Sequence, residues 1–156
     1  MATVDERPHD HPRSTAKIGG HPIHPMLVPF PIVCFILVFL CDIRIAQGHA
    51  NLAAATNWLL IIGLVMGALA AAAGLTDFLG EKRIQGSDAV QHMLANVTVV
   101  VLEVVNLVLR IRNADFIAST GIYISLVVVL ILLYSGWKGG ELVFKHGMGV
   151  HDRSDR

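Results

Sequence analysis

Four long apolar stretches, separated by short polar segments, dominate the pattern of residues along the chain. A transmembrane helix needs about 20 consecutive, mostly apolar residues, and each of the four stretches meets that length. The predicted spans cover residues 26–45, 58–79, 90–111 and 116–137. Because the connecting segments are short, neighbouring helices should be antiparallel. The pattern predicts an all-α, integral membrane, up-down four-helix bundle with both chain ends on one side of the membrane.

The segments outside the four spans are polar. Residues 1–20 contain no long apolar run, so they predict a disordered N-terminal tail rather than a cleavable signal peptide. Residues 21–151 form the predicted transmembrane domain, and residues 152–156 form a short C-terminal tail. After the fourth span, the pair Gly139-Gly140 is expected to break the helix. The amphipathic segment 141–144 would then lie flat on the membrane surface.

The composition agrees with a membrane location and excludes nucleic-acid binding. Hydrophobic residues make up 54% of the 156 residues and charged residues only 15%, whereas soluble domains have about 25% charged residues. Twelve basic and 12 acidic residues balance to zero net charge, so no basic field exists to hold nucleic acid. Most flanking Lys and Arg residues lie on the side that carries both chain ends, here called the terminal face. This asymmetry predicts that the terminal face is cytoplasmic.

Histidines gather at the terminal face. His21 and His24 precede the first span, His92 opens the third span, and His146 follows the fourth. Asp77, at the end of the second span, lies at the same membrane level. Imidazoles from different segments are suited to binding a transition metal or the iron of haem b. The alternative is a hydrogen-bonded belt in which the same side chains lock the helix ends.

Prolines set the expected geometry of the first two histidines. Residues 21–31 read HPIHPMLVPFP, and a residue before proline is disfavoured in the helical conformation. His21 and His24 are therefore predicted to be extended, about 9 Å apart in polyproline geometry. That distance suits two separate sites, or one ligand and a supporting group, better than one shared metal ion. The first helix is expected to begin at Pro29 or Pro31.

The third span carries a line of polar residues. They are His92, Asn96, Glu103, Asn106 and Arg110. At about 100° per residue they fall within about 80° of one another around the helix. Lipid offers these groups no partners, so the stripe must face the bundle interior, where Glu103 is either protonated or paired. The stripe either forms hydrogen bonds between helices or lines a proton path or redox site, and the residues leave both readings open.

The second span has a stripe of small residues instead. Its members are Gly63, Gly67, Ala70 and Gly74. Small residues allow close approach of a neighbouring helix, which is the commoner cause, or of a flat cofactor. The stripe includes a GxxxG pattern, which is also compatible with a homodimer seam. On the first span, Asp42 and Arg44 are expected to pair with each other or to reach toward the headgroups.

These segments together resemble a known bacterial family of membrane proteins. The segments are HPIHPMLVPFPI (21–32), GLTDF (74–78), HMLAN (92–96) and GWKGGELVFKHGMGV (136–150). Over residues 20–151 the chain is similar to the four-helix proteins called domain of unknown function 2231, which implies a bacterial inner (cytoplasmic) membrane location. The resemblance implies that the signature positions are His21, His24, Asp77, His92, Asn96 and His146. Glu103 lies outside that pattern. Some relatives look as if they are joined to, or encoded beside, Rieske-type or cytochrome modules, and this association favours a role in electron transfer.

Two functions follow from these residues, and whether the protein is an enzyme stays open. The first is electron transfer, with haem b or a metal held by the four histidines, Asp77 and Asn96 in support, and redox partner proteins. The second is a non-catalytic structural or accessory subunit whose His/Asp cluster locks the helix ends. A small transporter would use Glu103 and the asparagines, but broken helices and an inverted repeat are missing from the pattern. No phosphate loop, nucleophile elbow or HExxH motif is present.

Overall fold

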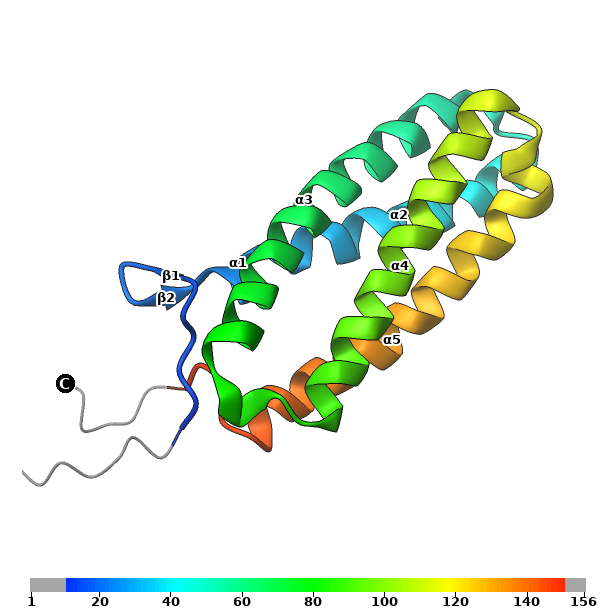
Figure 1. Ribbon diagram of the computed structural model, residues 1–156. Helices are drawn as coiled ribbons and strands as arrows, with labels where there is room; N and C mark the ends of the chain where they lie inside the picture. The colour runs from blue at the N-terminus through cyan, green and yellow to red at the C-terminus, as the bar shows by residue number, and fades with distance from the viewer. Residues whose placement is uncertain (1–10, 151–156) are drawn as a thin grey trace, which may run out of the picture.

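The computed structural model describes residues 11–150, whose helices pack side by side (Figure 1). Four long helices follow one another along the chain: α2 (Pro29–Ala46), α3 (Ala53–Gly80), α4 (Ser87–Arg112) and α5 (Ile122–Phe144). Short connections turn the chain back at each end of the bundle, so successive helices are antiparallel. The predicted all-α, up-down four-helix class is therefore confirmed.

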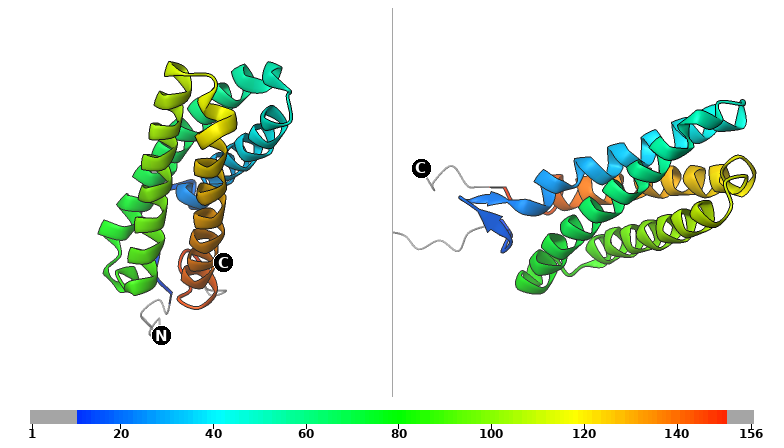
Figure 2. Two further views of the ribbon diagram at one scale, coloured as in Figure 1. Left: turned by 90° about the vertical axis from the view of Figure 1, so that its right-hand side faces the viewer. Right: turned by 90° about the horizontal axis from the view of Figure 1, so that it is seen from above.

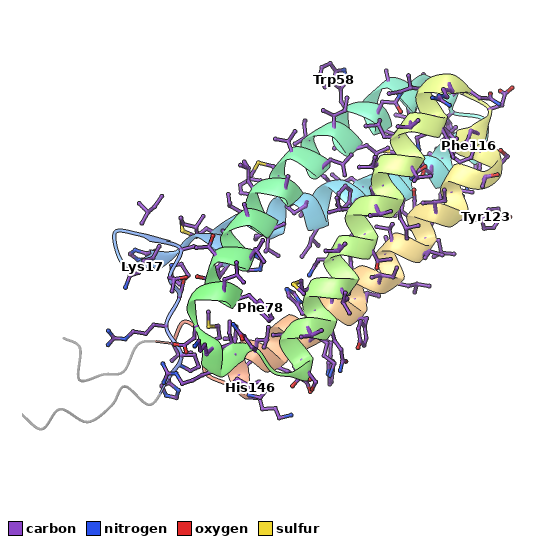
Figure 3. All side chains as sticks on the ribbon, viewed as in Figure 1. Lys17, Trp58, Phe78, Phe116, Tyr123 and His146 are labelled. Atoms are coloured by element: carbon purple, nitrogen blue, oxygen red, sulfur yellow. The ribbon has the colours of Figure 1, made fainter. Side chains whose placement is uncertain are left out.

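Each helical run is long and apolar enough to cross a membrane. The candidate spans are Ile23–Ala46, Ala50–Gly80, Ser87–Arg112 and Ile117–Phe144. Many large apolar side chains on them are exposed, and Trp58 and Tyr123 point away from the bundle in Figure 3. An apolar outer surface of this kind suits contact with lipid. The predicted spans agree with these helices, except that the second begins earlier and the fourth extends further.

The bundle interior is packed where the four helices meet. Helix α2 contacts α3 and α5, and α4 contacts α5 and α3, which closes a ring of four neighbours (Figure 2). The buried core side chains come from all four helices: Phe35, Val38, Leu60, Val99, Val128 and Leu132. Because lipid is as apolar as these side chains, close fit rather than escape from water holds the helices together.

Glycine lets α3 approach α2 closely. A Cβ atom on Gly63 would lie 2.6 Å from Cε1 of Phe35, and one on Gly67 would lie 3.7 Å from Cβ of Pro31. The ring of Phe35 fills the notch at Gly63 and is fully buried. The close helix packing predicted from the small-residue stripe is confirmed at these two positions.

Short elements connect the long helices. The turns η1 (Ala50–Leu52) and η3 (Ile117–Gly121) lie at the end opposite the terminal face, and η2 (Lys82–Ile84) lies at the terminal face (Figure 1). Strands β1 (Lys17–Ile18) and β2 (His21–Pro22) form an antiparallel hairpin before helix α1 (Ile23–Leu27). Helix α2 then begins at Pro29, which is one of the two predicted starts.

The two histidines in the segment before α2 have different conformations. His21 lies in β2 and is extended as predicted. The extended conformation predicted for His24 is wrong, because His24 lies in α1. Pro25 stands in the first turn of α1, where its missing N–H costs no hydrogen bond. The short helix turns His24 toward the bundle.

The chain just before the hairpin is attached to the bundle. The backbone N–H groups of Thr15 and Ala16 donate hydrogen bonds of 2.7 and 2.8 Å to Oδ1 of Asp77 on α3. The sequence predicted a disordered tail over residues 1–20, and residues 14–18 depart from that expectation because a carboxylate far along the chain supplies their partner. No pattern within the segment itself could reveal this contact.

Both ends of the described chain lie at the same end of the bundle (Figure 1). The N–H of Gly149 donates a hydrogen bond of 3.0 Å to the carbonyl of Pro12. Residues 1–10 of the predicted N-terminal tail lie outside the described residues, and so do residues 151–156 with the predicted C-terminal tail. The placement of the chain ends on one side agrees with an even number of spans.

Helix α5 continues through its glycine pair. The break predicted at Gly139-Gly140 is wrong, and so is a separate surface segment after it, because the helix runs unbroken to Phe144. The ammonium of Lys138 and the carboxylate of Glu141 form an ion pair of 2.8 Å across this stretch. A Cβ on Gly139 would lie 3.1 Å from Cε1 of His92. The glycine therefore makes room for a neighbouring ring instead of ending the helix.

Candidate functional site

Two of the four histidines of the predicted site lie close together inside the half of the bundle next to the terminal face. The ring centroids of His24 on α1 and His92 on α4 lie 6.1 Å apart, with ring planes at 84°. Both side chains are partly buried. Two imidazoles from segments far apart in the sequence therefore share one place, here called the histidine pair.

The main chain of two other helices orients both rings. Nδ1 of His24 lies 2.7 Å from the carbonyl oxygen of Ala70 on α3, and Nδ1 of His92 lies 2.9 Å from that of Ser135 on α5. A ring nitrogen that faces a carbonyl carries the proton and donates, so the lone pair of each ring is on Nε2. Metal-binding histidines adopt this arrangement, because the hydrogen bond on one nitrogen fixes the other as the ligand.

Asn96 occupies the lone-pair side of one ring. Its Nδ2 lies 3.1 Å from Nε2 of His92, and it donates hydrogen bonds of 2.8 Å to the His92 carbonyl and to Oγ of Ser135. Asn96 therefore links the ring and main chain of His92 to Ser135 on α5. It also competes with any ion that would bind Nε2 of His92.

Glycines on α3 and α5 provide the space for the two rings. A Cβ on Gly74 would lie 2.8 Å from Nδ1 of His24, and a Cβ on Gly139 would contact His92. Each histidine thus lies over a glycine one helical turn after the carbonyl that it binds. The imidazoles themselves fill the notches, so these two glycines position the histidine pair.

The other two predicted histidines lie apart from the pair. His21 is exposed in the hairpin, with Nδ1 3.0 Å from the carbonyl of Gly19. His146 is exposed as well, and its Nε2 lies 3.0 Å from Oδ2 of Asp88. Within residues 11–150 no three His, Cys, Asp or Glu side chains come together in a group that could hold a metal ion. The candidate site is therefore smaller than the four-histidine cluster that the sequence suggested.

Asp77 anchors the N-terminal segment. Besides the two backbone N–H groups described above, its Oδ1 accepts hydrogen bonds from Oγ of Ser14 at 2.9 Å and from Oγ1 of Thr15 at 3.3 Å. Successive N–H groups that converge on one carboxylate form an anion-binding nest. Asp77 and Ser14 are both buried, at 6% and 7% exposed. In this structure Asp77 holds the segment just before β1 rather than the histidine pair.

A second polar cluster lies in the bundle interior toward the opposite end. Both terminal nitrogens of Arg110 donate to the carboxylate of Asp42, and Oγ of Ser125 donates to the same carboxylate at 2.7 Å. Arg110 Nε donates to Oδ1 of Asn106 at 2.8 Å. All four side chains are at most 2% exposed. The polar stripe of α4 therefore faces the interior, as predicted.

The partner of Asp42 was not predicted. The sequence suggested that Asp42 pairs with Arg44 or reaches toward the headgroups, but Arg44 instead contacts Gln47 and His49 at 2.7 Å each. Residues two apart on a helix do not face each other, which excludes the predicted pair. The available signal was a carboxylate within an apolar run, together with Ser125 in a mostly apolar fourth span.

Glu103 completes the interior cluster. Its Oε2 accepts a hydrogen bond of 2.9 Å from Nδ2 of Asn106. Within the described part of the chain its Oε1 makes no hydrogen bond, although the side chain is 0% exposed. Glu103 is therefore buried with one of its two oxygens lacking a protein donor.

An ion pair at the terminal face organises the turn between α3 and α4. Oε1 of Glu81 accepts hydrogen bonds from the backbone N–H and Nε of Arg83 at 3.1 and 3.0 Å, and Oε2 accepts one from Arg83 at 2.8 Å. These donors lower the pKa of Glu81 to about 2. The carboxylate therefore stays ionised over most of the acidic pH range.

The fold and the apolar outer surface define a multi-pass membrane protein. The chain matches the family described as predicted membrane protein (DUF2231) over residues 20–152. This match covers most of its length, so the chain belongs to that family, as the resemblance predicted. No curated protein and no solved structure shows significant similarity to the chain.

Proposed function

We propose that this membrane protein binds a redox-active transition metal through Nε2 of His24 and His92 and passes electrons through it. The supporting observation is the histidine pair, with ring centroids 6.1 Å apart and each Nδ1 tied to a backbone carbonyl. An imidazole nitrogen lies about 2 Å from a bound ion, so two rings that shared one ion would have centroids within roughly 6 Å of each other. The observed separation matches that requirement.

The donor set fits two forms of the metal. Two imidazoles would suit a bare iron or copper ion, and two histidines from different segments would also suit haem b. When bound, an iron or copper centre accepts and releases one electron. His24 and His92 would hold it, the carbonyls of Ala70 and Ser135 fix the orientation of the two rings, and Asn96 would have to turn away from Nε2 of His92. His21 and His146 lie outside this proposed coordination.

A metal analysis of the purified full-length protein tests this proposal. The protein is made in cells supplied with iron, copper and a haem precursor, and its metal content and reduced-minus-oxidised absorption spectrum are recorded. A Soret band that disappears in His24→Ala and His92→Ala identifies haem, and stoichiometric iron or copper without that band identifies a bare ion. The exposed histidines provide matched controls, since His21→Ala and His146→Ala should retain the metal. Protein without metal or haem under these conditions would refute the proposal.

A second candidate function is a structural or accessory membrane subunit. It is favoured by the contacts of Asp77 with the N-terminal segment and by the contacts of Asp88 with Lys138 and His146 at 3.0 Å each. Here hydrogen bonds lock the helix ends and no metal is needed. Metal-free protein that loses thermal stability in His92→Ala would support this role.

The proposed setting is the bacterial inner membrane, with the terminal face in the cytoplasm. The excess of Lys and Arg at that face supports this orientation. In this setting the histidine pair lies near the cytoplasmic surface, within reach of a redox partner protein that docks there. A homodimer through the GxxxG pattern is less well supported, because Gly63 and Gly67 of α3 already pack against α2.

A further inference from the structure

The interior cluster contains one cation and two carboxyl groups. Arg110 is 2% exposed, and Asp42 and Glu103 are both 0% exposed. If both carboxyl groups were ionised, the cluster would carry one uncompensated negative charge inside the membrane region. An isolated carboxylate in such surroundings is very costly and takes up a proton instead. The hydrogen bonds show which of the two carboxyl groups bears that proton.

Every donor of Arg110 that the structure describes is directed away from Glu103. Both terminal nitrogens bind the carboxylate of Asp42, one of them also contacts Oγ of Ser125 at 3.0 Å, and Nε binds Asn106. Asp42 is therefore compensated by a two-point ion pair and by a hydroxyl group. Asp42 is the ionised member of the cluster.

Glu103 has only a neutral neighbour in hydrogen-bond contact. The amide of Asn106 donates to Oε2, and Oε1 has no donor among residues 11–150. The other ionisable side chains of the surrounding helices lie at the terminal face, on the outer surface or against another helix: Cys34, Cys41, Arg44, Asp77, Asp88, His92, Arg112, Tyr123, Tyr134, Lys138 and Glu141. Asp42 and Arg110 are thus the charged groups that share its part of the interior.

We propose that Glu103 is a proton-binding site in the membrane interior and is a neutral carboxylic acid at neutral pH. The unpaired Oε1 carries the proton, while Oε2 accepts from Asn106. Asn106 joins this acid to the ion pair through Arg110, so a change in the ion pair alters the hydrogen bond to Glu103. This site is independent of metal binding at the histidine pair.

Infrared difference spectroscopy tests the protonation state directly. Full-length protein in lipid vesicles at pH 7 is compared with Glu103→Gln, and the C=O stretching band of a protonated carboxylic acid should be present only in the wild type. Asp115→Asn provides the control, because Asp115 is exposed and its difference spectrum should show carboxylate bands alone. Carboxylate bands alone in the Glu103→Gln difference would overturn the proposal.

A chemical label gives a second measurement that needs no variant. N,N′-dicyclohexylcarbodiimide enters membranes and adds to protonated carboxyl groups, whose proton moves to a nitrogen of the reagent. Mass spectrometry of wild-type protein should find one added reagent molecule on the peptide containing Glu103, with labelling that falls at least several-fold at alkaline pH. Labelling that NaCl suppresses and pH does not would identify Na⁺ as the occupant and overturn the proposal. Complete absence of label together with absence of the infrared band would overturn it too.

Discussion

At the scale of single residues, each buried charge in the bundle interior depends on one specific partner. The carboxylate of Asp42 holds both terminal nitrogens of Arg110, and neither side chain is exposed. Removal of one member of such a pair leaves the other charged in apolar surroundings, which costs about 3–5 kcal/mol. Replacement of both members by apolar residues of similar size is often neutral. The pair therefore makes a strong prediction for a single substitution.

Asp42→Asn is expected to lower the free energy of unfolding by about 3 kcal/mol, because Arg110 loses its counterion. The measurement is SDS-induced unfolding of the protein in mixed micelles, followed by circular dichroism. Asp115→Asn removes an exposed carboxylate and should change the same quantity by less than about 0.5 kcal/mol. Similar small losses in both variants would show that the Asp42–Arg110 pair is not the main stabilising contact at this position.

The pH dependence of stability is expected to include a contribution from Glu81. Its pKa is about 2 in the folded protein and 4.5 ordinarily, so the folded state favours the ionised form. This contribution is therefore fully present above pH 4.5 and is lost as the pH falls from there toward 2. Glu81→Gln should remove it, which unfolding measured between pH 6 and pH 2 would reveal. A Glu81 side chain that titrates near 4.5 by NMR would contradict the expectation.

At the scale of helices and strands, the long elements could be predicted from sequence and the short ones could not. The length of the apolar runs alone specifies α2 to α5, because a membrane helix satisfies its own backbone hydrogen bonds. The segment that leads into the hairpin and α1 is held by Asp77, which follows Ala16 by 61 residues. The continuation of α5 past Gly139 depends on His92 of another helix. Such contacts between distant segments leave no local pattern.

Gly74→Ala is expected to displace His24 and to separate the histidine pair, since the new Cβ would lie 2.8 Å from Nδ1 of that ring. The loss should appear as a several-fold lower metal or haem content at unchanged expression. Gly136→Ala is the matched control, because nothing lies within 4 Å of the added Cβ. Equal metal content in the two variants would show that the notch at Gly74 does not position His24.

Asp77→Ala is expected to release the N-terminal segment while the four long helices remain intact. The carboxylate supplies the acceptor for Ser14, Thr15 and Ala16, which lack another acceptor of this kind once it is removed. Trypsin should then cleave after Arg13 or Lys17 several-fold faster in detergent. Thr76→Ala changes the neighbouring residue, whose hydroxyl donates to the carbonyl of Ala72 in its own helix, and should leave the cleavage rate unchanged. Faster cleavage in both variants would contradict an anchoring role that is specific to Asp77.

At the scale of the whole molecule, the structure sharpens the charge difference between the two membrane faces. Arg110 lies toward the face opposite the terminal face, but it is buried against Asp42 and is not an exposed flanking cation. Among residues 11–150, Arg44 and Arg112 remain as exposed flanking cations there. The terminal face has six flanking cations in the same range: Arg13, Lys17, Lys82, Arg83, Lys138 and Lys145. The asymmetry favours a cytoplasmic terminal face.

Reporter fusions are expected to place the C-terminus in the cytoplasm and the turn at Gly48 on the other side of the membrane. Alkaline phosphatase is active only outside the cytoplasm and green fluorescent protein fluoresces only inside, so each position is tested with both reporters. Phosphatase activity at the C-terminus with fluorescence at Gly48 would reverse the proposed orientation. Equal signals at both positions would contradict the three candidate spans that separate Gly48 from the C-terminus.

The candidate site could be predicted only in part. The sequence correctly assigned the polar stripe of α4 to the interior, because lipid leaves no alternative for Asn106 and Arg110. It assigned His21, His24, His92 and His146 to one membrane level, and the structure brings two of these rings together. Depth along a helix follows from residue number, but the direction of a side chain across the bundle depends on which helices are neighbours. Packing contacts between the helices decide which helices are neighbours.

The docking of the two histidines follows the same pattern in the two halves of the chain. The ring of His24 contacts a carbonyl of α3 and the ring of His92 contacts a carbonyl of α5, and each lies over a glycine one turn further along, at Ala70 and Gly74 in one case and at Ser135 and Gly139 in the other. Asp42 and Arg110 are separated by the same 68 residues as His24 and His92. Each half of the molecule thus supplies one imidazole and one charge, like the two subunits of a dimer fused into a single polypeptide. Co-expressed halves that are divided within the turn at η2 should therefore reassemble around both pairs.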